Sequence, residues 1–283
     1  MRSFLAFLFG VAAVLATLLT VPAMWVSHNV ANEDGYVAFA ELIARDAAFQ
    51  DALANALSEN LVQDSVLPAS LQPAAMAAIV RVANKVSDQP GFVTAWNDTQ
   101  RQSHKIMLGS PGDLPAELDS SSRFAIDLAP LGTFVINQVN KELPFTIPAP
   151  NQAVVEINGA PQAQTLDRIR ESPTYARNGL IAVGVLLLVA LAFARRRSVA
   201  VAWLGLGALV AAGLLKVAAS VGVPEILDRN TAPTPFAKAA LDVFIGRANT
   251  SFDHWLVVLA VGGAVAAVVG VAGRLLTSRS GVA

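Results

Sequence analysis

The stretch WNDTQRQSHKIMLG, residues 96–109, carries the side chains of this sequence that are best suited to binding or chemistry. It places Trp96, Arg101 and His104 within nine residues, in a chain with three histidines and no cysteine. An indole can stack on a ligand, a guanidinium can hold an anion, and an imidazole can transfer a proton. These three residues are the candidate ligand-binding site. No nucleophile or carboxylate pair accompanies them at a defined spacing, so no catalytic residue is expected.

Helical spacing favours a structural interpretation of the same stretch. Trp96 and His104 are eight residues apart, which is about 80° around a helix. The stripe that they share consists of Phe92, Trp96, Gln100, His104 and Met107. Such a stripe is typical of a helix facing a core, and Arg101 lies off it. We therefore expect a buried helix, with the ligand site as the alternative.

Sequence motifs for known chemistries are absent. The chain has no G-x-S-x-G, no H-E-x-x-H, no Walker A sequence and no dinucleotide fingerprint. Three isolated histidines do not form a zinc set, and a chain without cysteine has no disulfide or thiolate site. No cofactor and no metal are therefore expected.

Four long uncharged segments predict a membrane protein. The composition is 54% hydrophobic and only 14% charged, which is unusually apolar for a soluble domain. The uncharged segments are residues 3–27, 178–194, 198–215 and 255–273. Each is long enough, with its flanks, to cross about 30 Å of hydrocarbon. Pro173 suits a first helical turn capped by Ser172, so the second span could begin there.

Lysine and arginine near the span ends predict the orientation. Arg2, the run Arg195–Arg197, Arg274 and Arg279 all fall on one side if both termini are cytoplasmic, whereas Arg177 falls on the other side. The domains are then an anchor at 1–27, an extracytoplasmic domain at 28–172, three spans within 173–276, and a cytoplasmic tail at 277–283. A signal peptide is the less favoured alternative for the first span, because its apolar segment is longer than a usual signal core.

Charge is divided unevenly between the outer segment and the rest of the chain. Residues 26–176 hold 17 Asp and Glu against 9 Lys and Arg, so a nucleic-acid partner is not supported. The positive remainder would meet anionic lipids at the inner face of the membrane. The expected partners are the lipid bilayer and a further membrane or envelope protein.

The outer segment is predicted to be mainly helical. Asn32 and Asp46 are expected to cap two helices, and Asp88 with Pro90 to begin a later one. A third helix, between these, is expected to turn Met76, Ile79, Val80 and Ala83 to one side.

Alternation around residues 124–128 and 153–157 predicts two strands flanking a helix that Pro130 opens. A right-handed crossover between parallel strands is favoured, and an antiparallel pair remains the alternative. Asp127, on the polar face of the first strand, is expected to be solvated or to cap a helix.

The second outer loop, residues 217–254, is expected to contain a helix that begins at Thr234-Pro235. Its apolar face consists of Phe236, Ala240, Val243 and Phe244. It is either an interfacial helix or an outer extension of the fourth span.

Small residues at four-residue spacing predict close packing of the spans. Gly262, Ala266 and Gly270 form one ridge, Gly263 and Ala267 form its neighbour, and Gly207 with Ala211 repeats the spacing in the third span. Packing within the chain is favoured over a homo-oligomer.

The sequence resembles a family of actinobacterial integral membrane proteins. The likeness is carried by DGYVAFAELIARDAAFQDALANALSENLV, by Trp96 followed by Arg101 and His104, and by AIDLAPLGTFVINQV. It implies an N-terminal anchor, an outer helical domain and C-terminal transmembrane helices, and no established activity. The first functional hypothesis is a non-enzymatic cell-envelope protein whose outer domain interacts with a partner or ligand. The second is an enzyme or transporter accessory subunit that uses a groove between that domain and the membrane.

Overall fold

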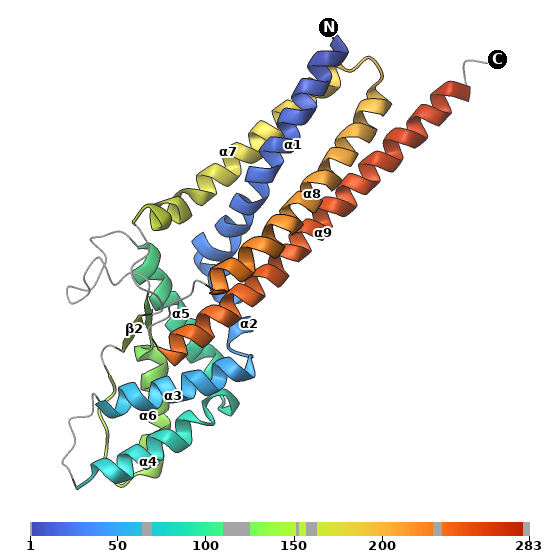
Figure 1. Ribbon diagram of the computed structural model, residues 1–283. Coiled ribbons are helices and arrows are strands. Elements are labelled where there is room, and N and C mark those ends of the chain that lie inside the picture. Colours follow the sequence, from blue (N-terminus) through green and yellow to red (C-terminus); the bar gives the residue numbers. More distant parts are fainter. Residues whose placement is uncertain are drawn as a thin grey trace. The chain divides into compact units, whose positions relative to one another are not determined.

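The computed structural model describes residues 2–63, 70–109, 125–150, 153–156, 163–228 and 234–279. Helices make up nearly all of this part of the chain, so the fold is mainly α as predicted (Figure 1). The chain divides into two units. Residues 1–28, 171–228 and 248–283 form what we call the membrane unit, and residues 29–170 and 229–247 form the helical unit.

Four helices carry segments long and apolar enough to cross a membrane. They are α1 (Arg2–Val26), α7 (Ala163–Phe193), α8 (Arg197–Asp228) and α9 (Pro235–Arg279). The candidate spans are Arg2–Ala31, Thr165–Phe193, Arg197–Glu225 and Pro235–Leu276. The four uncharged segments of the sequence fall within these helices, except for their last residues Ser27 and Ala194, so the prediction of four membrane-spanning helices is confirmed.

The helices extend beyond the uncharged segments. Pro173 was expected in a first helical turn, and this is wrong, since Pro173 lies inside α7. Pro22 and Pro224 likewise lie inside α1 and α8. Proline is tolerated within membrane helices because neighbouring groups satisfy the freed carbonyl. In α9 the structure has the outer extension of the fourth span and not a separate interfacial helix.

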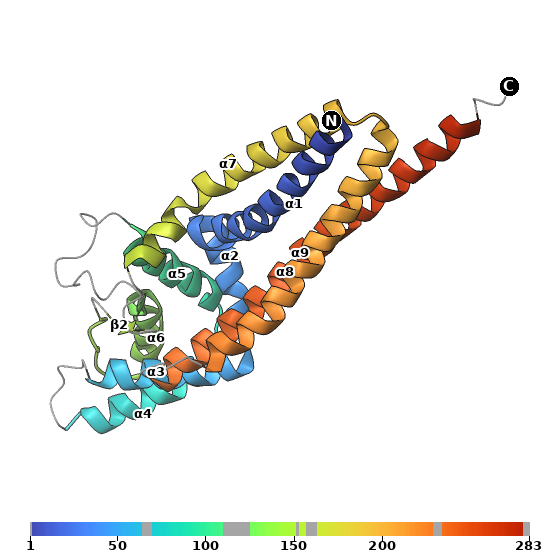
Figure 2. The ribbon, with the colours of Figure 1, turned by 45° about the horizontal axis from the view of Figure 1, so that its top comes forward.

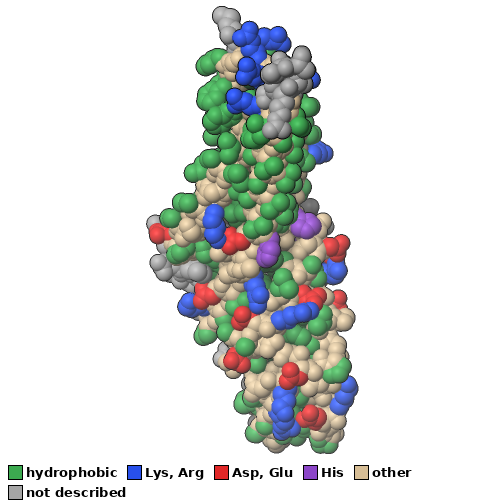
Figure 3. Space-filling model, turned by 90° about the vertical axis from the view of Figure 1, so that its right-hand side faces the viewer, with side chains coloured by type: hydrophobic (Ala, Val, Ile, Leu, Met, Phe, Trp, Pro, Cys, Tyr) green, Lys and Arg blue, Asp and Glu red, His purple; other side chains and the backbone are tan. Residues whose placement is uncertain are grey.

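The start of α1, the arginine-rich turn and the last turns of α9 share one end of the membrane unit. Figures 1 and 2 both show the N terminus, the turn between α7 and α8, and the last turns of α9 at this end. Arg195, Arg196 and Arg197 are exposed there. Hydrophobic side chains cover the adjoining helix surfaces in Figure 3. The arginines near these helix ends therefore lie together at one end of the membrane unit.

Close helix packing in the membrane unit uses residues from both predicted ridges of α9. A Cβ on Gly270 would lie 2.6 Å from the Ser198 carbonyl oxygen, and one on Gly263 would lie 2.8 Å from that of Gly205. Nothing lies within 4 Å of the corresponding position on Gly262, which is exposed. The ridge predicted through Gly262, Ala266 and Gly270 is therefore wrong at Gly262, but Gly270 packs closely as predicted. Gly263 of the neighbouring ridge also faces α8.

The predicted ridge of α8 packs on another helix. A Cβ on Gly207 would lie 2.6 Å from a methyl group of Val14 in α1, and Ala211 is fully buried. On α9, Ala266 is half-buried. Packing within the chain accounts for Gly207, Gly263 and Gly270.

The helical unit begins with short helices whose caps match the sequence. Its first elements are η1 (Ser27–Ala31), α2 (Glu33–Ile43), α3 (Ala47–Gln63) and α4 (Gln72–Ala83). Asn32 Oδ1 accepts a hydrogen bond of 2.8 Å from Gly35 N, and Asp46 Oδ1 accepts from Ala48 N and Phe49 N. Both predicted caps are confirmed. On α4, however, Met76 and Val80 are exposed, and alanines occupy much of the buried face instead.

The central helix of this unit, α5 (Phe92–Leu108), begins later than expected. A short helix, η2 (Val86–Asp88), precedes it, and Gly91 is its N-cap residue. Gly91 has φ of 92°, which a side chain would strain. The sharp turn at Gly91, and not Asp88 with Pro90, therefore starts α5. Helix α5 contacts α2, the later helix α6 (Ala129–Glu142) and the strand β1 (Ala125–Asp127).

The two strands β1 (Ala125–Asp127) and β2 (Val154–Glu156) flank α6 (Ala129–Glu142). They pair antiparallel, with Ile126 opposite Val155. The favoured parallel crossover is therefore wrong, and the antiparallel alternative is correct. The extended segment after α6 gives the chain enough length to return in the opposite direction. Phe124 and Ile157, the outer ends of the predicted strands, lie outside the described residues.

Candidate functional site

The structural and the ligand-binding interpretation of residues 96–109 both apply to helix α5. Phe92, Trp96, Gln100, His104 and Met107 are all buried, so the predicted inward stripe is confirmed. Four of them, Trp96, Gln100, His104 and Met107, also line a cavity within the helical unit. The buried face of α5 is therefore both core and cavity wall.

Trp96 anchors α5 in the core. Only 1% of its surface is exposed, and its Nε1 donates a hydrogen bond of 3.0 Å to the Ala40 carbonyl oxygen in α2. Its ring lies edge-on to Phe49, with the centroids 5.3 Å apart. Since its only polar atom is satisfied within the protein, Trp96 can offer a ligand only its apolar surface.

His104 is held by one nitrogen. Its Nε2 lies 3.0 Å from the Val30 carbonyl oxygen. A carbonyl can only accept, so Nε2 carries a proton and donates this bond. The ring centroid lies 5.2 Å from that of Tyr36. Within the described residues, Nδ1 has no hydrogen-bond partner.

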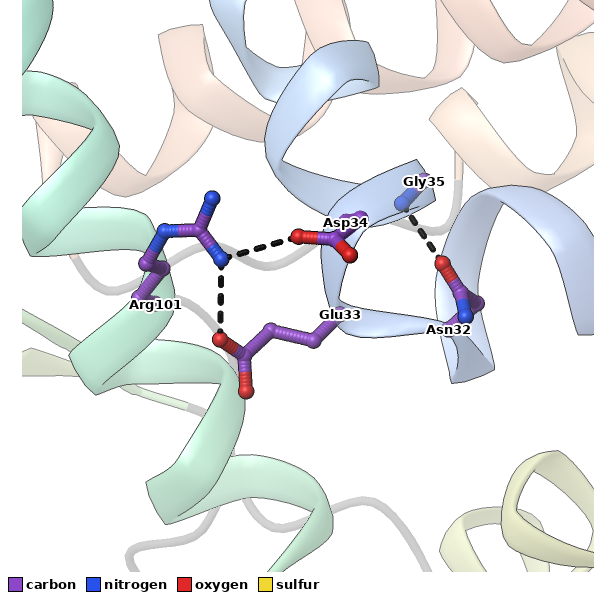
Figure 4. Close-up of polar contacts among 5 residues, drawn as sticks. All are labelled: Asn32, Glu33, Asp34, Gly35 and Arg101. Carbon is purple, nitrogen blue, oxygen red and sulfur yellow. Dashed lines mark hydrogen bonds and ion pairs between the residues drawn. The ribbon is translucent and has the colours of Figure 1, made fainter.

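Arg101 does not join the other two predicted site residues. Its Nη1 contacts Glu33 Oε1 and Asp34 Oδ1, each at 3.0 Å, and Figure 4 shows it reaching the first turn of α2. Hydrogen bonds to Asp34 and Glu33 raise the pKa of Arg101 above its usual value. Arg101 is absent from the cavity lining, and it joins α5 to the capped start of α2.

The cavity beside α5 has a volume of about 100 Å³ and an almost wholly apolar wall. Four aromatic rings line it, those of Tyr36, Phe49, Trp96 and Phe244. Cavities of comparable size with apolar walls bind small apolar molecules such as benzene. The volume accommodates a small group, not a drug-sized ligand.

Helices far apart in the sequence complete the wall. Ala240, Leu241 and Phe244 come from the first turns of α9, and Leu166 and Ile169 come from the start of α7. Phe244 lies edge-on to Phe39, with ring centroids 5.2 Å apart, and Thr234 Oγ1 caps this end of α9 by accepting from Ala237 N. The apolar face predicted in the second outer loop thus covers the cavity.

An unpaired donor lies in this apolar wall. Gln100 is 1% exposed, and its Nε2 has no hydrogen-bond partner in the part of the chain that the structure describes. Asn97 Oδ1 and Asn249 Oδ1 are also unpaired, but neither residue lines the cavity. A buried donor without a partner costs roughly 1–3 kcal/mol. A ligand that supplied an acceptor atom would remove this cost.

Tyr36 adds a second polar group to the cavity. Burial raises the pKa of its phenol above the usual value, so the hydroxyl stays protonated at neutral pH. No hydrogen bond reaches this hydroxyl from a described residue. The polar atoms open to a ligand are therefore those of Gln100, Tyr36 and His104.

The face of α5 toward β1 and α6 is polar, buried and fully paired. Thr99 Oγ1 accepts from Leu131 N at 3.1 Å, and Ser103 Oγ accepts from Asp127 N at 3.0 Å. Asp127 Oδ1 accepts from Ala129 N and Ala153 N. Asp127 is thus a buried cap, 5% exposed, and not a solvated residue. These bonds fix the strand pair and α6 against α5.

Sequence reasoning found Trp96 and His104 but did not single out Tyr36 or Gln100 as site residues. Gln100 was placed on the buried stripe, and its polar character at that position was the available signal. Among the described residues, no three His, Cys, Asp or Glu side chains form a group that could hold a metal ion.

Comparisons with known protein families, curated proteins and solved structures find no match for this chain. The resemblance to an actinobacterial membrane family therefore stays an expectation.

Proposed function

We propose that this protein is a membrane-anchored binding protein. Its four membrane helices fix it in the bilayer, and the cavity beside α5 in the helical unit holds a small apolar molecule. The observation that carries the proposal is the unpaired Nε2 of Gln100 in an otherwise apolar wall. A folded core normally pairs its buried polar groups, and the adjacent face of α5 does so at Thr99 and Ser103.

The ligand chemistry follows from the free polar atoms. Gln100 Nε2 and the Tyr36 hydroxyl can donate, so the bound molecule carries an acceptor oxygen on an apolar body. The four aromatic rings supply the apolar contact. Arg101 is engaged by Glu33 and Asp34, so no guanidinium is available to a fully charged ligand here. A carbonyl compound of a few carbon atoms fits this description.

A matched pair of probes tests the proposal with the full chain in detergent. Cyclohexanone and methylenecyclohexane have nearly the same shape and differ in the acceptor oxygen. We expect cyclohexanone to raise the thermal unfolding midpoint more than methylenecyclohexane, because binding to the folded state stabilises it. Equal shifts by the two probes would contradict the proposed role of Gln100.

Gln100→Leu provides the matched variant. Leucine keeps the side chain close in size and removes the unpaired donor, so the ligand-free protein should gain up to roughly 1–3 kcal/mol. The preference for cyclohexanone should disappear. A loss of stability in Gln100→Leu would show that the amide is already satisfied, and the binding proposal would fail with it.

We further propose that the helical unit is extracytoplasmic and that both termini are cytoplasmic. The support is the gathering of arginines at one end of the membrane unit, which favours the cytoplasmic side. The chain has no native cysteine, so a thiol reagent can react only with a cysteine that has been introduced. In intact cells a membrane-impermeant thiol reagent should reach Lys85→Cys and should not reach Arg196→Cys. The reverse pattern would invert the proposed orientation.

A further inference from the structure

A second hollow lies in the membrane unit, at the end that carries the arginine-rich turn. It encloses about 720 Å³ along α1, the end of α7 and the first turns of α8. The groove is open because many of the residues that line it have small side chains. Among them are Ala6, Gly10, Ala194 and Ala200. This volume lies within the range of sites that hold a complete small molecule.

The wall of this groove changes from apolar to cationic at the arginine-rich turn. Arg195 and Arg196 line its end, and Phe7, Val11 and Trp203 line its length. These three apolar side chains are 68%, 40% and 69% exposed, so the described part of the chain leaves them largely uncovered. A groove of this kind suits a molecule with one anionic end and a long apolar body.

The guanidiniums of Arg195 and Arg196 have no counter-ion among the residues that the structure describes. Neither Arg195 nor Arg196 has an ion pair with a described residue, and the sequence has no Asp or Glu from residue 172 to residue 224 or from 2 to 32. The positive charge at this end is therefore balanced from outside. Arginine binds phosphate oxygens in a bidentate geometry, which makes a phosphate group the natural partner.

We propose that this groove is a binding site for one anionic phospholipid. The phosphate lies at Arg195 and Arg196, and an acyl chain lies along the groove past Trp203. Charge complementarity selects an anionic headgroup, because the ammonium of a zwitterionic lipid would meet the same arginines. This site is independent of the cavity beside α5.

The test measures which lipid stays bound to the purified full chain. The protein is incubated in mild detergent with equal amounts of dipalmitoyl phosphatidylglycerol and dipalmitoyl phosphatidylcholine, and retained lipid is counted by native mass spectrometry. We expect phosphatidylglycerol to be retained over phosphatidylcholine. Excess inorganic phosphate should not displace it, because free phosphate lacks the acyl chain. Equal retention of the two lipids, or displacement by phosphate, would overturn the proposal.

Arginine variants locate the headgroup. The double variant Arg195→Gln, Arg196→Gln should weaken retention of phosphatidylglycerol by about tenfold or more, as expected for lost charge-assisted hydrogen bonds. Arg197→Gln is the control, because Arg197 is the next residue but does not line the groove. Equal retention by the wild type and the double variant, or equal losses in the double variant and in Arg197→Gln, would overturn the site.

A bulky variant locates the acyl chain and keeps the proposal testable if the arginine variants do not fold. Ala6→Trp places a ring in the groove and should displace the lipid. Ala264→Trp makes the same change on an exposed position of α9 outside the groove and should leave the lipid bound. Lipid retained by Ala6→Trp at the wild-type level would show that the chain does not lie in the groove.

Discussion

The contact of α8 with α9 and the contact of α2 with α5 are built in opposite ways. At the first, Gly205, Gly263 and Gly270 let the two backbones approach closely. At the second, Trp96 fills the space, and its Nε1 bonds to the Ala40 carbonyl. One contact depends on the absence of side chains and the other on a large ring.

The surroundings of each contact explain the difference. In water, burying a large apolar side chain is strongly favourable, so large rings stabilise the helical unit. In lipid, an apolar side chain gains little by leaving the hydrocarbon, so helices associate through close backbone packing. The most exposed apolar residues of the membrane unit, such as Val258 at 73%, are therefore in a suitable environment.

The largest effect is expected from tryptophan in the helical unit. Trp96→Ala should lower the free energy of unfolding by roughly 3–5 kcal/mol, because a fully buried ring is lost. Leu188→Ala in α7 is the control, since that side chain is 69% exposed and does not line the lipid groove, and it should change stability little. Chemical unfolding of the full chain in detergent, followed by circular dichroism, measures both. Similar losses would mean that burial does not distinguish the two regions.

At close-packed glycines of the membrane unit, adding a side chain should lower stability, whereas at Trp96 removing one does. Gly270→Leu forces a side chain into the Ser198 carbonyl and should cost roughly 1–3 kcal/mol, as overpacking does. Gly262→Leu, on the open side of the same helix, should be nearly silent. Thermal unfolding of the two variants in detergent gives the comparison. An unchanged unfolding midpoint in Gly270→Leu would show that α8 and α9 do not pack closely at Gly270.

The same contrast explains how much of the fold the sequence predicts. A helix in water has one apolar stripe, so the buried face of α5 and the caps at Asn32 and Asp46 follow from local pattern. A helix in lipid is apolar on all sides, so the pattern cannot tell Gly262 from Gly263. The antiparallel strand pair likewise depends on the path of the chain after α6, which local pattern does not fix.

The candidate site was only partly predictable, for a related reason. Burial of Trp96 and His104 follows from helical spacing, but the partners of polar atoms come from distant segments. Arg101 is joined to Glu33 and Asp34 across more than 65 residues, and this pairing removes it from the site. No sequence spacing indicates that Gln100 lacks a partner while Ser103, three residues on, has two.

A smaller effect, confined to alkaline solution, is expected from Tyr36. Burial raises its pKa in the folded state above the unfolded value of about 10, so the unfolded chain loses the proton first. Stability is therefore complete below pH about 10 and falls above it, by at most about 1.4 kcal/mol per pH unit for one proton. Tyr36→Phe should remove this part of the pH dependence. Tyr175→Phe is the control, and an identical pH profile in wild type and Tyr36→Phe would contradict the assignment.

The smallest effect is expected from Arg101, although it makes two ion pairs. Its side chain is 42% exposed and that of Asp34 is 82% exposed, so water and salt screen the attraction. Arg101→Gln should lower the unfolding midpoint slightly at low ionic strength and leave it unchanged at high ionic strength. Arg45→Gln, which breaks the exposed pair with Glu41, is the matched control and should behave alike. A large, salt-independent loss in Arg101→Gln alone would show that the start of α2 depends on this arginine. If instead Arg101→Gln abolished the preference for cyclohexanone while the fold melted normally, the ligand site would include Arg101 after all.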